Sequence, residues 1–385
     1  MSRLRSLALA GVQTLLRMLP FPCRTGLVEI GRPGPDSPVL LTGNFWLTVE
    51  RVKRALGGLD AFLLVANSRG VNVWCAATGG LLTNHDVISV LKTSGVGERV
   101  KHRRLILPQL AATGIEGGEV HKKTGWRVHW GPVRCEDLPV YLRNGLRKTV
   151  AMRTVSFPWR ERLEMAVAWA FPISLLSLVL LPFWPGGVAP LMAVVWALSL
   201  LLFLAFPLYE PLVRGKKKHI GFVFFDFGER GIVLLLWLVL LAGLALTSAL
   251  SDDYSAGFAV RWGVASFVVL AILGLDLTGS TPLYKSGLHE DRQLRITLDE
   301  ARCKGAGFCE QSCPTHVFEM EPSRKLVRLP RSERCVQCGA CIVQCPFDAL
   351  FFQSPDGEVV SPETIRRYKL NLLGTRRVQA PELTH

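Results

Sequence analysis

The spacing of the cysteines between residues 303 and 345 constrains the fold more than any other feature of this 385-residue chain. Cys335, Cys338 and Cys341 are followed by Cys345 and a proline, which gives a C-x2-C-x2-C-x3-C-P run. In such a run three thiolates hold one face of an iron–sulfur cubane, and the fourth thiolate ligates a second cluster. Zinc is the weaker interpretation, because zinc sites usually pair C-x2-C units across a longer loop. The run therefore predicts a compact domain built around two clusters.

An upstream run supplies the remaining ligands, with one of them missing. Cys303, Cys309 and Cys313 keep the pattern, but Ala306 stands where the second cysteine belongs. One cluster, a [4Fe-4S] cluster, therefore has four ligands, which are Cys313, Cys335, Cys338 and Cys341. The other cluster has three ligands, which are Cys303, Cys309 and Cys345. Three thiolates suit a [3Fe-4S] cluster, or a second [4Fe-4S] cluster with one labile iron, and we predict [3Fe-4S].

Residues 290–352 are the predicted α+β two-cluster domain of bacterial ferredoxin type, and residues 353–385 form a C-terminal tail. Short apolar segments at 295–298 and 317–319 fit the strands of such a domain. Because this cysteine spacing indicates metal ligands and not disulfides, it implies a reducing compartment, and hence the cytoplasmic side of a membrane.

Apolar runs in the middle of the chain predict a polytopic α-helical membrane domain of about four helices over residues 161–280. The runs cover about 163–183, 187–208, 231–250 and 260–278, and most approach the roughly 20 residues that a spanning helix needs. Arg and Lys cluster beside the runs, so the net charge of +14 is explained by a membrane and requires no nucleic acid. Basic connections alternate with uncharged or acidic ones. This pattern predicts a multi-pass protein of the cell inner membrane with both soluble domains facing the cytoplasm.

Two shorter segments are also assigned relative to the membrane. Residues 1–35 are expected to form a basic amphipathic helix on the membrane surface, followed by a proline-containing linker. The alternative is a start helix that packs on the protein. Residues 220–227 are apolar but too short to cross, and they are interpreted as interfacial or re-entrant.

Residues 36–160 alternate between strand and helix patterns. Strands are expected at 39–41, 61–66, 105–107 and 126–130, with helices at 48–56, 84–91, 119–124 and 137–145. Asn84 is a candidate cap of the second of these helices. Such alternation predicts an open α/β sheet, in which ligands bind beyond the carboxyl ends of the strands. Cys75 lies just past one of these strand ends, and no nucleotide-binding glycine motif stands at a strand–helix junction.

The segment around Cys75 is the second candidate site. The general interpretation of a free cysteine flanked by Trp and Ala is a small buried hydrophobic residue. The segment is made of Asn72, Val73, Trp74, Cys75, Ala76 and Ala77. It resembles the cap-helix motif of the corrinoid protein of bacterial mercury methylation. Residues 43–45, 102–110 and 131–139 also resemble that family, and the similarity spans about residues 36–160, ahead of a membrane region as in the family. At Thr78-Gly79 the family pattern has Gly-Lys instead.

This resemblance implies a Rossmann-like corrinoid-binding domain in which Cys75 is the catalytic residue and the lower axial ligand of cobalt. The six residues 72–77 would bind the corrinoid, a cobamide. The cluster domain resembles the separate ferredoxin partner of the same system, here fused to its corrinoid protein. Implied partners are a methyl donor, of methyltetrahydrofolate-type methyltransferase origin, and a low-potential electron donor. The methyl acceptor would be Hg(II) or another soft acceptor.

Two other functions remain open at this point. The first is a membrane-anchored ferredoxin-type electron carrier without corrinoid, in which Cys75 is structural. The second is a carbonyl-transfer corrinoid subunit like those of acetyl-CoA synthesis, for which membrane helices are unexpected. Corrinoid content distinguishes the first of these from the methyltransferase.

Overall fold

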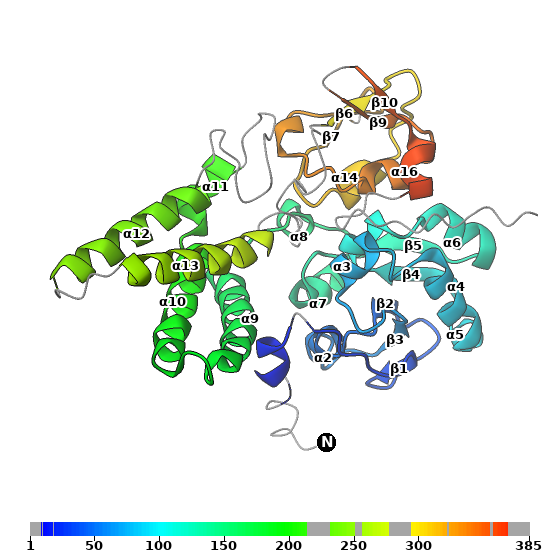
Figure 1. Ribbon diagram of the computed structural model, residues 1–385. Coiled ribbons are helices and arrows are strands. Elements are labelled where there is room, and N and C mark those ends of the chain that lie inside the picture. Colours follow the sequence, from blue (N-terminus) through cyan, green and yellow to red (C-terminus); the bar gives the residue numbers. More distant parts are fainter. Residues whose placement is uncertain are drawn as a thin grey trace, which may run out of the picture. The chain divides into compact units, whose positions relative to one another are not determined.

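The structure of the protein is a computed structural model (Figure 1), and it describes residues 9, 11–17, 19–213, 232–250, 256–276, 294–321, 323–354 and 357–368. The chain forms two compact units. One comprises residues 1–19 and 156–291, and the other comprises residues 20–155 and 292–385. The second unit contains both regions for which the sequence predicts a site.

A five-stranded sheet forms the centre of the N-terminal α/β domain. Its strands are β1 (Gly26–Ile30), β2 (Val39–Gly43), β3 (Ala61–Ala66), β4 (Arg104–Leu107) and β5 (Arg127–Trp130), in the spatial order β1-β3-β2-β4-β5. The last four are parallel, and β1 is antiparallel to β3. The mixed α/β class predicted from the sequence is therefore confirmed.

Strand β1 corrects the expected extent of the linker. Residues 26–30 pair with residues 61–65 of β3, a strand in which every residue is buried. Without β1, the backbone of a buried apolar strand would form an exposed edge of the sheet. Because β1 has no strict alternation of apolar and polar residues, the sequence pattern did not reveal it.

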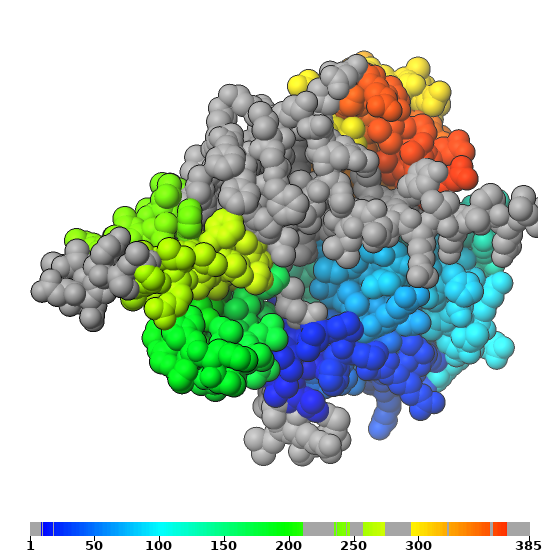
Figure 2. Space-filling model, viewed as in Figure 1, coloured from blue at the N-terminus to red at the C-terminus, as the bar shows by residue number. Residues whose placement is uncertain are grey.

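Helices cover both faces of this sheet because the strand residues alternate between them. Val39 and Leu41 pack in the core with α4 (Asn84–Thr93), α5 (Val96–Arg99) and α6 (Gly117–Thr124). Leu40 packs in the opposite core with α2 (Trp46–Ala55), α7 (Leu138–Arg143) and α8 (Val150–Arg153). In the space-filling view the domain is a continuous blue-to-cyan surface (Figure 2). The result is a three-layer α/β domain.

Three short helical segments lie in the connections of the same domain. They are α3 (Val73–Thr78), η1 (Gln109–Thr113) and η2 (Cys135–Asp137). The cap of α4 differs from the expectation. Thr83 is the N-cap, and it forms a capping box with Asp86, while Asn84 is the first residue of the helix. The reciprocal Thr–Asp pairing satisfies the free amides of the first turn, so Asn84 is not needed for this role.

The C-terminal domain combines small sheets with short helices. Strands β6 (Arg295–Leu298), β9 (Leu350–Gln353) and β10 (Val359–Val360) form one antiparallel sheet, and β7 (Glu319–Glu321) pairs with β8 (Leu326–Arg328). The helices are α14 (Phe308–Ser312), η5 (Ser332–Arg334), α15 (Ala340–Gln344) and α16 (Pro362–Tyr368). Phe318, Ile342 and Phe352 are fully buried in its core. The segment 317–319 was predicted as a strand. Residues 317 and 318 instead lie in the core outside any strand, and Glu319 is the first residue of β7.

The first unit is helical. Its elements are α9 (Trp159–Ser177), η3 (Leu178–Leu180), α10 (Pro185–Leu204), α11 (Phe206–Val213), α12 (Ile232–Leu250) and α13 (Ala256–Asp276). Within the described part of the chain, two helical segments are long and apolar enough to cross a membrane, Trp159–Leu180 and Pro185–Leu204. All four apolar runs contain a helix, but these two are the candidate spans. Residues 220–227 lie outside the described residues.

Near the start of the chain, residues 11–15 are helical, and Arg17 forms an ion pair with Glu164 of α9 at 3.2 Å. This contact joins the N-terminal segment to the helical unit. It favours the alternative considered above, in which the start helix packs on the protein.

Candidate functional site

The carboxyl edge of the α/β sheet contains a topological switch point. From β2 the chain crosses to β3 on one side, and it later returns to β4 on the other side. Strands β2 and β4 pair only at Val39 with Leu105 and at Leu40 with Ile106. The two strands therefore diverge before their carboxyl ends, which opens a crevice between them. In open α/β sheets, ligands bind at a crevice in this position.

A buried amide, Asn44, organises the loops at this edge. Its Oδ1 accepts the amide N–H of Ser68 at 2.9 Å, the Ser68 hydroxyl at 3.1 Å and the amide N–H of Gly70 at 2.9 Å. Its Nδ2 donates to the Cys23 carbonyl at 3.2 Å. Gly43 allows this arrangement, because a Cβ there would meet the Ser68 Oγ at 2.6 Å. Asn44 therefore determines the path of the loop that leads from β3 into α3.

Helix α3 begins at Val73, one residue after this loop. The Asn72 side chain caps it by accepting the Cys75 amide N–H at 3.0 Å. Cys75 is partly exposed, whereas Trp74, Ala76 and Ala77 are buried. The structure therefore brings the six predicted residues into one capped turn and presents the thiol-bearing residue at its surface.

Two observations bear on whether this turn can hold a large flat cofactor. The buried indole Nε1 of Trp74 has no hydrogen-bond partner among the described residues, so a donor remains available beside Cys75. Ala76 and Ala77 add no bulk to the helix. A soft thiol, a free donor and small neighbours fit a corrin with a soft transition metal.

The turn η1 packs against α3 and helps to fix its position. Gly114, the residue that follows η1, approaches α3 so closely that a Cβ at this position would lie 2.5 Å from the Ala77 carbonyl oxygen. Buried residues of both elements, including Ala76 and Ala111, belong to one apolar core. The position of α3 is therefore set by η1 as well as by the Asn44 loop.

The predicted cluster ligands gather in two groups in the C-terminal domain. Burial and the neighbouring Cys345 and Cys303 thiols raise the pKa of Cys309 to about 12. Burial, Cys313 and Cys335 raise the pKa of Cys338 far above its usual range. Negative charges on these thiols would therefore repel each other. The thiols that interact in this way fall into the two sets that the sequence spacing assigns.

Cys341 belongs to the four-thiol set by the same criterion. Burial raises its pKa, followed by the thiols Cys335, Cys338 and Cys313, with Cys309 contributing least. Buried thiols that disfavour ionisation become ligands when a metal replaces their protons. Among the described residues no three His, Cys, Asp or Glu side chains converge on one metal ion. Ligands of a cubane bind different irons, so they need not converge on a point.

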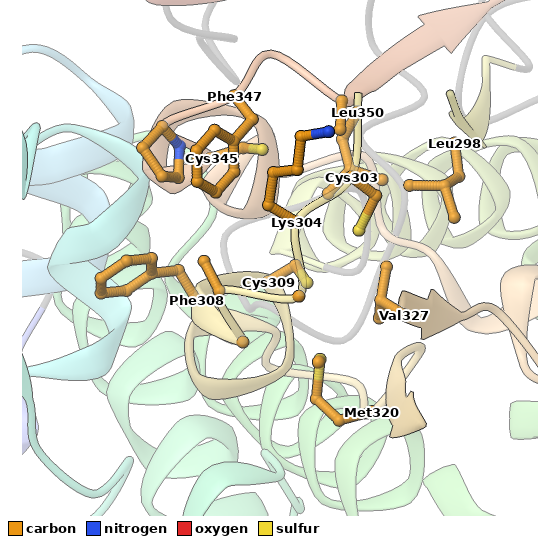
Figure 3. Close-up of a pocket in the computed structure, with 15 residues that line it drawn as sticks. Leu298, Cys303, Lys304, Phe308, Cys309, Met320, Val327, Cys345, Phe347 and Leu350 are labelled. Carbon is orange, nitrogen blue, oxygen red and sulfur yellow. The ribbon is translucent and has the colours of Figure 1, made fainter. Parts of the chain in front are cut away.

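A pocket lies among the members of the three-thiol set (Figure 3). Cys303, Cys309 and Cys345 all line this partly open pocket. Apolar walls complete the pocket, formed by Leu298, Met320, Val327 and Leu350. Ala306, at the position where the cysteine pattern lacks a ligand, also lines it. A donor set of three thiols within apolar walls fits an iron–sulfur cluster.

Known proteins match two separate regions of the chain. Residues 17–142 match the family model described as CO dehydrogenase/acetyl-CoA synthase delta subunit, and residues 302–349 match the 4Fe-4S dicluster domain. The gamma subunit of the acetyl-CoA decarbonylase/synthase complex of Archaeoglobus fulgidus is 39% identical over 116 residues, which is 30% of this chain and 24% of that subunit. The Methanothermobacter thermautotrophicus subunit is 40% identical over 119 residues, 30% of this chain and 26% of the subunit.

These matches define a chain that joins an α/β domain related to acetyl-CoA decarbonylase/synthase subunits to a 4Fe-4S dicluster domain. The chain spans about a quarter of the length of these curated relatives. The wider relationship agrees with the sequence analysis. The matches do not distinguish the mercury-methylation branch, which stays an expectation.

Three functional candidates were missed from the sequence, namely Gln109, Lys148 and Gln344. The Lys148 Nζ donates to the Gln109 Oε1 at 2.6 Å, the Gly131 carbonyl at 3.1 Å and the Gln311 carbonyl at 2.7 Å. Burial, and then the Arg153 guanidinium, lower the pKa of Lys148 to about 7. Polar residues in loops carry no periodic signal, so only the fold could reveal these contacts.

The importance of Asn44 can be tested by Asn44→Ala. This change leaves two buried amides and a carbonyl without partners, so the free energy of unfolding should fall by roughly 2 to 4 kcal/mol. Asn67→Ala is the control, because Asn67 accepts only the exposed Arg69 amide in the same loop. We expect its effect to stay within about 0.5 kcal/mol in urea unfolding followed by tryptophan fluorescence. Equal effects of the two changes would refute the role of Asn44.

The lowered pKa of Lys148 predicts a pH dependence of stability. Above about pH 7 the native lysine releases its proton, whereas in the unfolded chain it keeps the proton up to about pH 10. The unfolded state then binds more protons, so this residue increases stability as pH rises through that window. The urea midpoint should gain more between about pH 6 and about pH 9 for the wild type than for Lys148→Met. Parallel profiles would show that Lys148 does not titrate there.

Proposed function

We propose that this protein is a membrane-bound corrinoid-dependent methyl-transfer protein whose fused iron–sulfur domain keeps the corrinoid reduced. The observation that carries the proposal is the capped turn at the switch point, which presents Cys75 beside the Trp74 indole, a donor with no partner in the described part of the chain. The matches to subunits of an acetyl-CoA decarbonylase/synthase complex support a corrinoid site in this domain.

The chain's own residues would divide the work at this site. A bound corrinoid supplies a cobalt centre that carries the methyl group. Cys75 would hold that metal as a soft thiolate ligand, and such an electron-donating ligand would suit transfer of the methyl group as a carbanion equivalent. Asn72 holds the Cys75 backbone through the helix cap. Ala76 and Ala77 leave room for a macrocycle.

The substrates follow from the resemblance and from the relatives. The relatives are named as subunits of an acetyl-CoA decarbonylase/synthase complex, and such an assembly is one context for the protein. The similarity of residues 72–77 to the mercury-methylation motif favours Hg(II) or another soft acceptor. A methyltetrahydrofolate-type methyltransferase would supply the methyl group, and a low-potential protein would supply electrons.

The location that we propose is the cell inner membrane. Support comes from the two helical segments long and apolar enough to span, Trp159–Leu180 and Pro185–Leu204. The helices α12 and α13 cover the third and fourth apolar runs. With basic residues at their cytoplasmic ends, four crossings would keep both soluble domains on the cytoplasmic side.

Corrinoid binding is tested by the cobalt content and anaerobic absorption spectrum of protein reconstituted with a cobamide. The wild type should hold one cobalt per chain with a thiolate-ligated spectrum, and Cys75→Ala should lose that spectrum. Cys23→Ala is the matched control, because Cys23 is a partly exposed cysteine that hydrogen-bonds through its backbone. Cobalt absent from the wild type, with intact clusters, would favour the membrane electron carrier. Methylmercury formation by a host expressing the protein then tests the acceptor.

We further propose that the three-thiol set holds a [3Fe-4S] cluster. EPR of the anaerobically purified protein should show one [3Fe-4S] signal after oxidation with ferricyanide and one [4Fe-4S] signal after reduction with dithionite. Ala306→Cys supplies a fourth thiol to the pocket, so it should replace the [3Fe-4S] signal with a second [4Fe-4S] signal. Ala301→Cys, exposed on the same loop, should leave the spectrum unchanged. Two reduced [4Fe-4S] signals in the wild type would refute this assignment.

A further inference from the structure

The turn η1 lies between the Cys75 helix and the cluster domain within one compact unit. It packs against α3 on one side, and against α15 and α14 on the other. Helix α15 carries Cys341 of the four-thiol set, whereas α14, which makes the smaller contact with η1, carries Cys309 of the three-thiol set. The same short segment therefore contacts the candidate corrinoid site and the ligands of a cluster.

The buried amide of Gln344 joins α15 to this turn. Its Nε2 donates to the carbonyls of Ala112 and Ile115, each at 2.7 Å, and its Oε1 accepts the Gly117 amide N–H at 3.2 Å. Gln344 lies between Cys341 and Cys345 in the sequence, and only 8% of its surface is exposed. Both N–H groups and the carbonyl oxygen of this side chain therefore bond to backbone of the α/β domain.

A second buried amide, Gln109, makes the reciprocal contact. Its Nε2 donates to the carbonyl of Cys313 at 3.2 Å, and to the carbonyl of Arg153 at 2.7 Å. Cys313 is the fourth ligand of the complete set. Next to it, the amide of Val155 donates to the Pro314 carbonyl at 2.7 Å, and Arg153 pairs with Glu310 at 3.0 Å.

Apolar contacts also join the side of the cluster domain that carries the four-thiol set to the α/β domain. Ala340 is buried in the core that contains Ala76 and Ala111 of the α/β domain, and Cys338 packs against that core. Both residues belong to the loop and helix that carry the four-thiol set. No member of the three-thiol set is part of this core as the structure describes it.

We infer that the two cluster positions are ordered, with the four-thiol set as the inner one, held against η1 by Gln109 and Gln344, and the three-thiol set as the outer one. This inference rests on the proposed function for its meaning, because the inner set is then the one positioned to exchange electrons with a group at α3. Gln109 and Gln344 are positioning residues for that set.

The protein surface next to the outer set has the features expected of a docking site for an electron donor. Phe308 and Phe347 line its pocket and are 38% and 42% exposed. Lys304 extends from the same rim (Figure 3). Exposed aromatic rings beside a cation fit transient contact with an external low-potential redox protein, which would lose one electron in the encounter.

The order is tested by the rate at which an anaerobic iron chelator removes each cluster from the full chain. EPR follows the two signals, which Cys335→Ser and Cys303→Ser assign to the inner and outer sets. In the wild type the outer cluster should be lost several-fold faster. The double variant Gln109→Leu with Gln344→Leu should accelerate loss of the inner cluster several-fold and leave the outer rate unchanged.

The control is Gln353→Leu, because among the described residues the Gln353 amide bonds to the Gly357 carbonyl, at 3.4 Å within the cluster domain, and not to the α/β domain. It should change neither rate. Equal rates in the wild type, or acceleration of the outer cluster alone in the double variant, would overturn the order. If the double variant does not fold, the wild-type rates still decide the question.

A second measurement separates this inference from the proposed function. In cobamide-loaded protein, reduction of the inner cluster should broaden the Co(II) EPR signal more than reduction of the outer cluster. Protein that retains no cobalt contradicts the proposed function, while the chelation rates still test the order. Cobalt retained, with equal broadening by both clusters, contradicts the order alone.

Discussion

Buried backbone groups at the carboxyl edge of the sheet need hydrogen-bond partners, and three side-chain amides supply them. Asn44 satisfies the loop before α3. Gln109 satisfies the carbonyls of Arg153 and Cys313, and Gln344 satisfies the carbonyls of Ala112 and Ile115. Leaving such groups unpaired would cost more than the bonds contribute, because water cannot reach them. The candidate corrinoid turn and the inner thiol set therefore depend on the same kind of contact. Each amide also connects segments that are distant in the chain.

The thiol sets impose a different constraint. Cys309, Cys338 and Cys341 are buried in places where burial raises the pKa of each thiol and neighbouring thiols raise it further. An ensemble of buried thiols contributes little to stability by itself, whereas metal ligation converts their mutual repulsion into bonds to a shared cluster. Folding of the C-terminal domain should therefore be coupled to cluster assembly. The α/β domain has a large apolar core on each face of its sheet and does not share this dependence.

Much of the architecture could be predicted from the sequence because it follows from local patterns. The four parallel strands are apolar runs, and β2, β3 and β4 lie where those runs predict them. Strand β1 could not be predicted, since its residues become a strand only by pairing with β3. The cap of α4 was placed one residue late, because Thr83 and Asn84 are both good caps and Asp86 decides between them. The apolar runs of the helical unit predicted helices correctly, but apolarity alone does not determine how many of them cross a membrane.

For the site, the sequence by itself was enough to predict which thiols belong together and that Ala306 leaves one set incomplete. The pattern is local, because ligands on short loops reach one cubane only at certain spacings. The sequence also placed Cys75 just beyond a strand end. Only the tertiary structure decided which thiol set faces the Cys75 helix. That choice depends on hydrogen bonds such as the one from Gln109 to Cys313, between residues 204 positions apart, and no local pattern encodes the pairing of two buried polar groups so far apart in the chain.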